Sequence, residues 1–195
     1  AVTKNGVLID GMPLGPRFYG RRKGRPLRAS MKRLLDEALP QFAFDPARSI
    51  DDQFGRKADR YLEIGFGGGE HLVHMAETYP QIGLIGCEPF INGVAMLLGK
   101  IRKAEVENLR VYPGDVRNLF DVLPAETLSK VFLNYPDPWP KKRHHRRRFV
   151  TPEHLAPLHR AMKPGAELRV ATDIPDYVRQ TLEEVPKQGF EWLAD

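Results

Sequence analysis

From about residue 60 onward, short apolar runs rich in β-forming residues alternate with longer stretches of helical periodicity. The runs predict strands at 61–64, 82–87, 109–112, 131–134 and 168–172, and the stretches predict helices near 69–79, 90–104, 152–162 and 175–185. Strands that alternate with helices pair in parallel through right-handed crossovers. The sequence therefore predicts an α/β fold with a doubly wound, mostly parallel sheet. In such sheets, ligands bind just beyond the carboxyl ends of the strands.

Positive charge is concentrated in two segments of the chain. Residues 17–33 contain eight Lys and Arg and no acid, and residues 141–148 contain six more and no acid. The remaining 16 of the 30 Lys and Arg are outnumbered by 25 Asp and Glu. We expect a basic N-terminal arm with a short helix over residues 1–58, and one folded domain over 59–195. Such dense cations repel one another unless a polyanion neutralises them, although a solvated arm is an open alternative for the first segment.

The sequence also argues against several classes of protein. No stretch approaches the roughly 20 consecutive apolar residues of a membrane span, and no apolar signal region begins the sequence. Cys87 is the one cysteine, so we read it as a small packed residue and expect a cytoplasmic protein. His144 and His145 lie in a cationic run that repels metal ions, and we read His71 and His74 as helix-surface residues without a nearby acid. We therefore expect no metal site.

The first predicted strand ends in a glycine-rich turn, "LEIGFGGGE", which contains Glu63, Gly65, Gly67 and Gly69. Glycines at this point let the backbone turn tightly and approach a ligand closely. Their spacing does not match the G-x-G-x-x-G turn of dinucleotide enzymes, and the acids would repel a pyrophosphate. They suit a ligand that carries an ammonium and a sulfonium. A tight turn without a ligand is the alternative.

Acids also follow the second and third predicted strands. Glu88 lies in "GCEPF", where a carboxylate can accept both hydroxyls of a ribose. Asp115 lies in "PGDVRNLF", where an adenine amino group would lie, although it could equally cap the helix that follows. Together with Glu63, these acids match the parts of S-adenosylmethionine.

The fourth predicted strand runs into "NYPDPWPKKRHHRRRF". Its prolines stiffen the segment and hold Asn134, Asp137 and Trp139 in fixed relation at the lip of the sheet. We interpret this segment as a nucleobase pocket with a carboxylate and an aromatic wall, followed by cations that meet the surrounding phosphates. A rigid loop in which Trp139 is a packing anchor is the alternative.

The segments "LEIGFGGGEHL", "GCEPF", "PGDVRNLF", "NYPDPWPKKRHHRRRF" and "ATD" resemble those of the bacterial tRNA (guanine-N7-)-methyltransferase family. The resemblance covers residues 60 to about 193, and "GRRKGRPLR" is similar to the family's N-terminal region. It implies a Rossmann-like class I methyltransferase fold, with S-adenosylmethionine as donor and tRNA as substrate. The methylated base would be guanosine 46 in the variable loop. Neither the preferred tRNAs nor the oligomeric state, monomer or homodimer, follows from the sequence.

The resemblance also implies roles for individual residues. Asp137 would belong to the catalytic centre and, with Glu63, Glu88 and Asp115, would contact the donor. The predicted donor site further includes Gly65, Gly67, Gly69, Pro89, Phe90, Val116 and Asn134. Lys141 and Asp173 would contact the substrate, although Asp173 could instead cap the helix at 175. The RNA-binding group would be Arg143, His144, His145, Arg146, Arg147 and Arg148.

The family usually continues with a Thr-x-x-Glu substrate motif, and the printed sequence reaches Asp195 without it. We expect either a shortened chain or a tail that was left out, and without this motif the guanine pocket would be incomplete.

The predicted reaction needs no general base, because guanine N7 carries a free lone pair and no proton. The enzyme must hold N7 on the order of 3–3.5 Å from the methyl group and exclude water. Asp137 would then stabilise the positive charge that develops on the base. Two alternatives remain open: an exocyclic-amine methyltransferase, suggested by the "NYPDPW" loop, and a non-catalytic RNA-binding subunit on the same fold.

Overall fold

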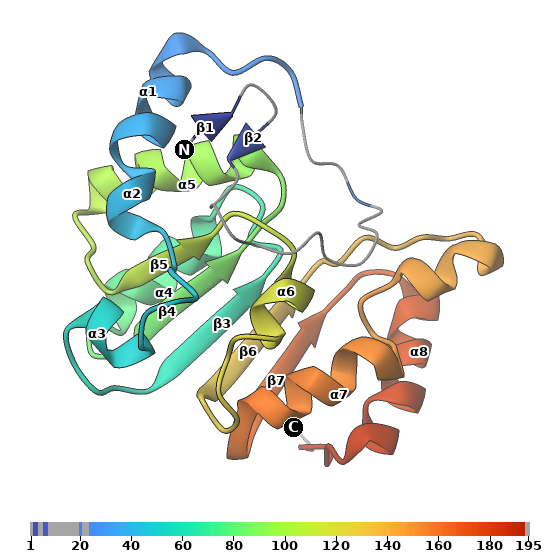
Figure 1. Cartoon of the computed structure of the whole chain (residues 1–195). Coiled ribbons are helices and arrows are strands. Elements are labelled where there is room, and N and C mark those ends of the chain that lie inside the picture. Colours follow the sequence, from blue (N-terminus) through green and yellow to red (C-terminus); the bar gives the residue numbers. More distant parts are fainter. Residues whose placement is uncertain (1, 4–5, 8–19, 21–23, 194–195) are drawn as a thin grey trace.

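A computed structural model describes residues 2–3, 6–7, 20 and 24–193 of the chain. Within these residues, five parallel strands form one sheet in the order β5-β4-β3-β6-β7 (Figure 1). The strands are β3 (Arg60–Ile64), β4 (Gly83–Cys87), β5 (Leu109–Tyr112), β6 (Leu128–Asn134) and β7 (Met162–Ala171). The chain runs outward from β3 to β5 and then crosses to β6, so the strand order reverses between β3 and β6. Doubly wound sheets bind their ligands at such a reversal. The predicted α/β fold with a parallel sheet is confirmed.

Helices cover both faces of the sheet (Figure 1). Leu72 of α4 and Leu97 of α5 pack in one core cluster, and Leu119 of α6 and Leu155 of α7 pack in the other. The helices that follow strands are α4 (Glu70–Thr78), α5 (Ile91–Ala104), α6 (Val116–Phe120), α7 (Pro152–Ala161) and α8 (Pro175–Glu184). The remaining elements are β1 (Val2–Thr3), β2 (Gly6–Val7), α1 (Ala29–Glu37), α2 (Leu39–Phe42), α3 (Ile50–Phe54) and the 3-10 helices η1 (Lys142–Arg147) and η2 (Pro186–Gln188).

The described part of the predicted N-terminal arm packs onto the sheet. Helix α1 lies against α5, and Leu35 and Leu39 are buried there. Phe44 is 2% exposed and packs in the core cluster that contains Leu119 and Leu155. Ala43 forms a parallel bridge with Val111. The described residues before 59 therefore pack against the domain predicted over 59–195, and the boundary at residue 58 stays a prediction. Arg17, Arg21, Arg22 and Lys23 of the basic segment lie outside the described residues.

Strand β7 begins earlier than the sequence predicts. Helix α7 ends at Ala161, and β7 starts at Met162 rather than near 168, with Pro164 and Gly165 inside it. The pairing shifts between Leu128 and Lys130 of β6, so β7 contains extra residues there. Proline lacks the amide donor of a regular ladder and is tolerated in strands at such irregularities. Pro164 and Gly165 therefore lie in a bulge of the strand.

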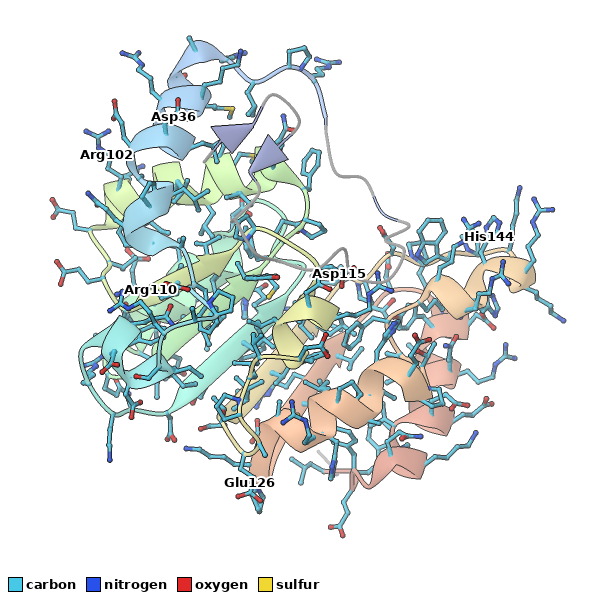
Figure 2. All side chains as sticks on the ribbon, viewed as in Figure 1. Asp36, Arg102, Arg110, Asp115, Glu126 and His144 are labelled. Carbon is cyan, nitrogen blue, oxygen red and sulfur yellow. The ribbon has the colours of Figure 1, made fainter. Side chains whose placement is uncertain are left out.

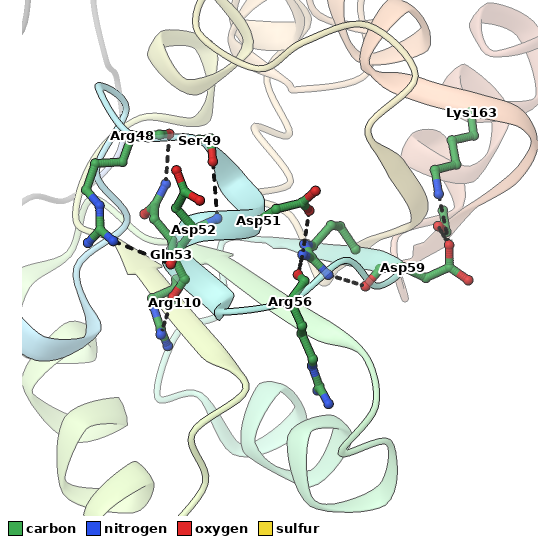
Figure 3. Close-up of polar contacts among 11 residues, drawn as sticks. Arg48, Ser49, Asp51, Asp52, Gln53, Arg56, Asp59, Arg110 and Lys163 are labelled. Carbon is green, nitrogen blue, oxygen red and sulfur yellow. Dashed lines mark hydrogen bonds and ion pairs between the residues drawn. The ribbon is translucent and has the colours of Figure 1, made fainter.

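A polar network ties α3 to the amino ends of the strands (Figure 3). Arg60 donates to the Asp51 carboxylate at 3.0 Å, and Arg110 donates to the backbone carbonyl of Gln53. These contacts join α3 to β3 and β5 at the edge opposite the one where ligands bind. The carboxyl edge of the sheet is therefore free of this structural network.

Two further findings concern the described residues as a set. No helix among them combines the length and the apolar character needed to cross a membrane. No three His, Cys, Asp or Glu side chains within that same part of the chain gather in a way that could hold a metal ion.

Cys87 is buried at 1% exposure, and burial raises the pKa of its thiol well above the ordinary value.

Candidate functional site

A cavity of about 650 Å³ lies at the carboxyl ends of the strands. Its volume is in the range of about 300–1,000 Å³ that is typical of small-molecule sites. It brings together eight residues of the predicted donor site: Gly65, Glu88, Pro89, Phe90, Asp115, Val116, Asn134 and Asp137. A larger adjoining cavity of about 1720 Å³ is lined by Glu63 and Gly67 and shares Gly65, Asn134 and Tyr135 with the first. The candidate site spans the junction of the two.

The turn after β3 depends on glycines in the left-handed region. The φ angles are 72° at Gly65, 57° at Gly67 and 81° at Gly69, where other residues are strained. A Cβ atom on Gly65 or Gly67 would meet no atom within 4 Å, so space is open beside both. A Cβ on Gly69 would lie 2.5 Å from the Leu97 side chain, and Gly69 lines neither cavity. Gly69 therefore serves the packing of α4 against α5, and its predicted donor contact stays a prediction.

Glu63 ends β3 as a buried carboxylate paired with a histidine. It is 3% exposed, and its Oε2 lies 3.1 Å from Nδ1 of His71 in the first turn of α4. Burial raises the pKa of Glu63, while His71 and Asn134 act in the opposite direction. The expectation that His71 has no nearby acid is therefore wrong, although its side chain is 38% exposed and His74 is exposed, as predicted for the helix surface. Sequence reasoning missed the pair of Glu63 and His71 because it did not place the first turn of α4 over the end of β3.

Glu88 connects β4 to the glycine-rich turn. Its carboxylate is 8% exposed and accepts hydrogen bonds from Gly67 N at 2.8 Å and Phe90 N at 2.9 Å. Burial raises the pKa of Glu88, and these two amide donors act against that shift. Each carboxylate oxygen keeps a second lone pair, because each accepts one backbone bond. Glu88 is therefore able to receive two hydroxyls of a ligand without losing the contacts that hold it.

Asp115 is confirmed as a helix cap, and it also lines the cavity. It is the N-cap of α6, where Oδ1 accepts from Arg117 N at 3.0 Å, and Arg117 also pairs with the carboxylate. Asp115 lines the cavity together with Val116, and Figure 2 labels its position. The cap fixes the side chain at the cavity wall, so the structural and the ligand-binding readings are compatible.

The raised pKa values of Glu63 and Glu88 predict how donor binding depends on pH. Burial disfavours the charge and so shifts both carboxyl groups toward the protonated form relative to an ordinary glutamate. A cationic donor requires the ionised form. Donor affinity is therefore expected to rise as pH increases from the ordinary glutamate value of 4.5 through the raised pKa values, and then to level off. Calorimetric titration in two buffers of different ionisation enthalpy should detect proton release on the acid side. An affinity that stays constant as pH rises from 4.5 would contradict this assignment.

Asp137 lies in a loop of unusual backbone geometry. It is exposed and lines the first cavity. The residues two positions before and after it, Tyr135 and Trp139, have φ angles of 52° and 41°, which bulky residues rarely adopt. The Arg147 guanidinium lies 5.0 Å from the centre of the Trp139 ring, and His144 meets that ring edge-on at 6.0 Å. Trp139 lines the cavity, and part of its ring is already covered by the basic segment (residues 141–148).

The basic segment separates into exposed and buried cations. Lys141, Lys142, Arg143 and Arg146 are exposed, and all but Lys141 lie on η1. His144, which Figure 2 labels, is half-buried, as are His145 and Arg147. Arg146 also lines the first cavity. An exposed row of cations therefore begins at the rim of the candidate site.

Arg148 does not share this surface, and its predicted contact with RNA stays a prediction. It is 1% exposed, and its guanidinium lies 5.1 Å from the centre of the Tyr177 ring. It donates to the Pro138 carbonyl at 2.8 Å and to Gln180 Oε1 at 2.8 Å, and it pairs with Asp176 at 2.9 Å. These contacts fasten the Asp137 loop to α8. The pKa of Asp176 is held below its usual value, chiefly by its hydrogen bond with Arg148.

The structure does not bring the predicted substrate residues into either cavity. Lys141 and Asp173 are exposed, and neither is among the described residues that line the two cavities. Asp173 is not the cap of α8, because the N-cap is Ile174, whose amide bonds to Thr172 Oγ1 at 3.2 Å. The helix-cap alternative for Asp173 is therefore wrong.

Comparisons with known proteins show which family the chain belongs to. Residues 57–194 match a family model described as "Putative methyltransferase". A tRNA (guanine-N(7)-)-methyltransferase of Jannaschia sp. (strain CCS1) is 65% identical over 188 residues, which cover 91% of this chain and 79% of that protein. A protein of the same name from Paracoccus denitrificans (strain Pd 1222) is 62% identical over 200 residues, which cover 96% of this chain and 84% of that protein.

A solved structure shows the same fold at low identity. The 16S rRNA (adenine(1408)-N(1))-methyltransferase from Catenulisporales acidiphilia, determined with its cosubstrate SAM, aligns with a TM-score of 0.55 at 18% identity. The alignment covers 78% of this chain and 76% of that one. The predicted class I methyltransferase fold is thereby confirmed. The chain belongs to the family of tRNA (guanine-N(7)-)-methyltransferases, as its sequence segments predicted.

Proposed function

We propose that this protein transfers a methyl group from S-adenosylmethionine to N7 of a guanine in tRNA. The observation that carries the proposal is the cavity at the strand-order reversal, where Glu88, Asp115 and Asp137 line one wall and exposed cations begin at the rim. Acids of this kind suit a cationic donor, and the cations suit an RNA backbone. One site thus offers matched places for both reactants.

The donor's place is supported by the chemistry of the residues present. Glu88 has free lone pairs for the ribose hydroxyls, and Asp115 lies at the next strand end for the adenine amino group. The open space beside Gly65 and Gly67 admits the rest of the molecule, with Glu63 buried beneath that turn. The donor supplies a methyl group on a sulfonium, and transfer forms a C–N7 bond as the S–C bond breaks, with the electron pair returning to sulfur.

Asp137 is assigned to the acceptor base. N7 of guanine has no proton to lose, so the reaction needs orientation and charge stabilisation rather than a base. An exposed carboxylate in a proline-stiffened loop orients the base edge and stabilises the positive charge that appears on the product. Access to a stacked guanine requires local unstacking, at a cost of a few kcal/mol that phosphate contacts offset.

The exposed cations of the basic segment predict a strong salt dependence of tRNA binding. Replacing Arg143 and Arg146 with glutamine is expected to reduce the slope of log affinity against log salt by about 1.5, because each lost phosphate contact removes about 0.7–0.9. Filter binding across a salt series measures this slope. The matched control replaces Arg56 and Lys57, exposed at the opposite edge of the sheet, with glutamine and should leave the slope unchanged. An equal reduction of the slope in both double variants would mean that tRNA binding depends on the net charge of the protein and not on where the cations lie.

Two finer assignments belong to the same proposal. Guanosine 46 of the variable loop is the target that the family resemblance implies. Since tRNA is the substrate, we place the protein in the cytoplasm. Lys141 and Asp173 remain substrate contacts in this proposal, on exposed positions flanking the site.

The proposal is tested by incubating the protein with labelled S-adenosylmethionine and unmodified tRNA, followed by nucleoside analysis. The expected result is label in 7-methylguanosine, and no label when 7-deazaguanosine replaces guanosine in the tRNA. Label in an exocyclic-amine product would favour the other enzyme class. No label, with no thermal stabilisation by the donor, would indicate a non-catalytic RNA-binding subunit.

A further inference from the structure

Tyr135 is a large aromatic residue that the fold leaves uncovered. Its side chain is 76% exposed, more than that of any other large hydrophobic residue in the described part of the chain. Its backbone is nevertheless held, because its amide donates to the Ala171 carbonyl of β7 at 2.7 Å. The ring is therefore presented to solvent from a fixed point at the end of β6.

The backbone at Tyr135 is strained as well. Its φ angle is 52°, a region that bulky residues rarely adopt, and Pro136 normally restricts the preceding residue to extended conformations. Strain of this kind persists where the surrounding structure enforces it, and it gathers at functional sites. Neither the strain nor the exposed ring contributes to the core, so the stability of the fold does not account for either.

The position of Tyr135 explains what the ring can do. It lines both the cavity that contains Asp137 and the adjoining cavity that contains Glu63. The exposed cations of η1 follow within a few residues. Exposed aromatic rings beside a cationic surface are stacking platforms for nucleobases, because every base has a π-face. Trp139 is less suited to this role, because the Arg147 guanidinium already lies over its ring.

We propose that the Tyr135 ring stacks on the guanine that reaches Asp137 after it leaves its stack in the RNA. The ring replaces the stacking that the base loses, and Asp137 fixes the base edge. Tyr135 is thus a substrate-positioning residue, and this inference rests on the proposed transfer to guanine in tRNA. The hydroxyl group has no part in it, since stacking needs only the ring.

Substitutions at Tyr135 separate stacking from other roles. Tyr135→Leu is expected to lower kcat/KM for tRNA by about 5- to 150-fold, the factor that base–aromatic stacking supplies. Tyr135→Phe should stay within about twofold of wild type because it keeps the ring. Tyr79→Leu is the matched control: Tyr79 is also an exposed tyrosine, 39% exposed, but it follows α4 at the other edge of the sheet. That variant should methylate tRNA at the wild-type rate.

Two further readouts address stability and the stacking itself. The melting temperature of Tyr135→Leu should not fall, because the ring is exposed and its backbone strained. A tRNA with 2-aminopurine in place of the target guanine should fluoresce more strongly when bound to Tyr135→Leu than to wild type, because a stacked 2-aminopurine is quenched.

Each remaining outcome would overturn the inference. If wild type methylates guanine in tRNA and Tyr135→Leu does so equally well, stacking by Tyr135 is wrong while the proposed function stands. If Tyr135→Leu loses activity together with a lower melting temperature, the ring packs against protein and not against a base. If wild type yields no 7-methylguanosine, the proposed function itself fails and this inference with it.

Discussion

Replacement of Asp137 with alanine is expected to reduce methyl transfer by about 100- to 1,000-fold while the protein remains folded. The size of the effect follows from removing one preorganised group that stabilises charge as it develops in the transition state. Stability should be preserved because Asp137 is exposed, so its loss leaves no buried partner unsatisfied. Single-turnover methylation of tRNA measures the rate, and the melting temperature measures the fold.

Two further variants sharpen this test. Asp137→Asn keeps a hydrogen-bonding group and removes the charge, so its activity should lie between alanine and wild type if charge stabilisation contributes. Asp121→Ala, at an exposed aspartate at the end of α6, is the matched control and should methylate normally. If Asp137→Ala methylated tRNA at nearly the wild-type rate, Asp137 would not belong to the catalytic centre.

The donor side of the site could be predicted from sequence because its residues follow strand ends. Parallel strands bring their carboxyl ends to one edge, so Glu88 and Asp115 had to approach each other once the strands were recognised. The cap at Asp115 was equally readable, because a cap depends on residues within one turn of the helix. Local rules and the sheet topology together were sufficient for this half of the site.

The acceptor side could be predicted only in part, because its geometry depends on contacts distant in sequence. Arg148 looks like its neighbours in the run "RRR", and only the approach of Gln180, 32 positions further on, shows that it is buried. The exposure of Tyr135 could not be read from its neighbours either, since aromatic residues after a strand usually pack inward. The alternative that Asp173 caps the helix failed because the N-cap is the next residue, Ile174, although the helix begins at Pro175 as predicted.

The short elements were missed for a different reason. Helices α2 and α3 are 4 and 5 residues long, too short to show a helical period. Their placement depends on tertiary contacts such as the bond from Arg110 to the Gln53 carbonyl. The early start of β7 also depends on its partner, because a strand with an internal Pro-Gly pair forms only where the neighbouring strand tolerates a shift.

Replacement of Arg148 with methionine is expected to lower the free energy of unfolding by about 1–3 kcal/mol. The Pro138 carbonyl and Gln180 Oε1 would lose a buried donor, whereas Asp176 is 35% exposed and keeps its pair with Arg179. At a melting shift of about 2–4 °C per kcal/mol for a chain of this size, a fall of about 2–12 °C should be seen. Arg146→Met, at an exposed position two residues away, is the matched control and should change stability by less than about 0.5 kcal/mol.

The same pair of variants distinguishes a structural cation from one that binds RNA. Arg146→Met should flatten the salt dependence of tRNA binding, because an exposed cation that neutralises a phosphate releases counterions. Arg148→Met should leave that slope nearly unchanged at temperatures where it is folded, and its activity should fall because the Pro138 carbonyl, next to Asp137, is no longer held. The opposite pattern, a flatter slope with unchanged stability for Arg148→Met, would mean that this side chain leaves α8 to reach a phosphate. In that case its prolines alone must fix the Asp137 loop. The stability of Arg148→Met therefore tests how the acceptor site is held rigid, although Arg148 does not line its cavity.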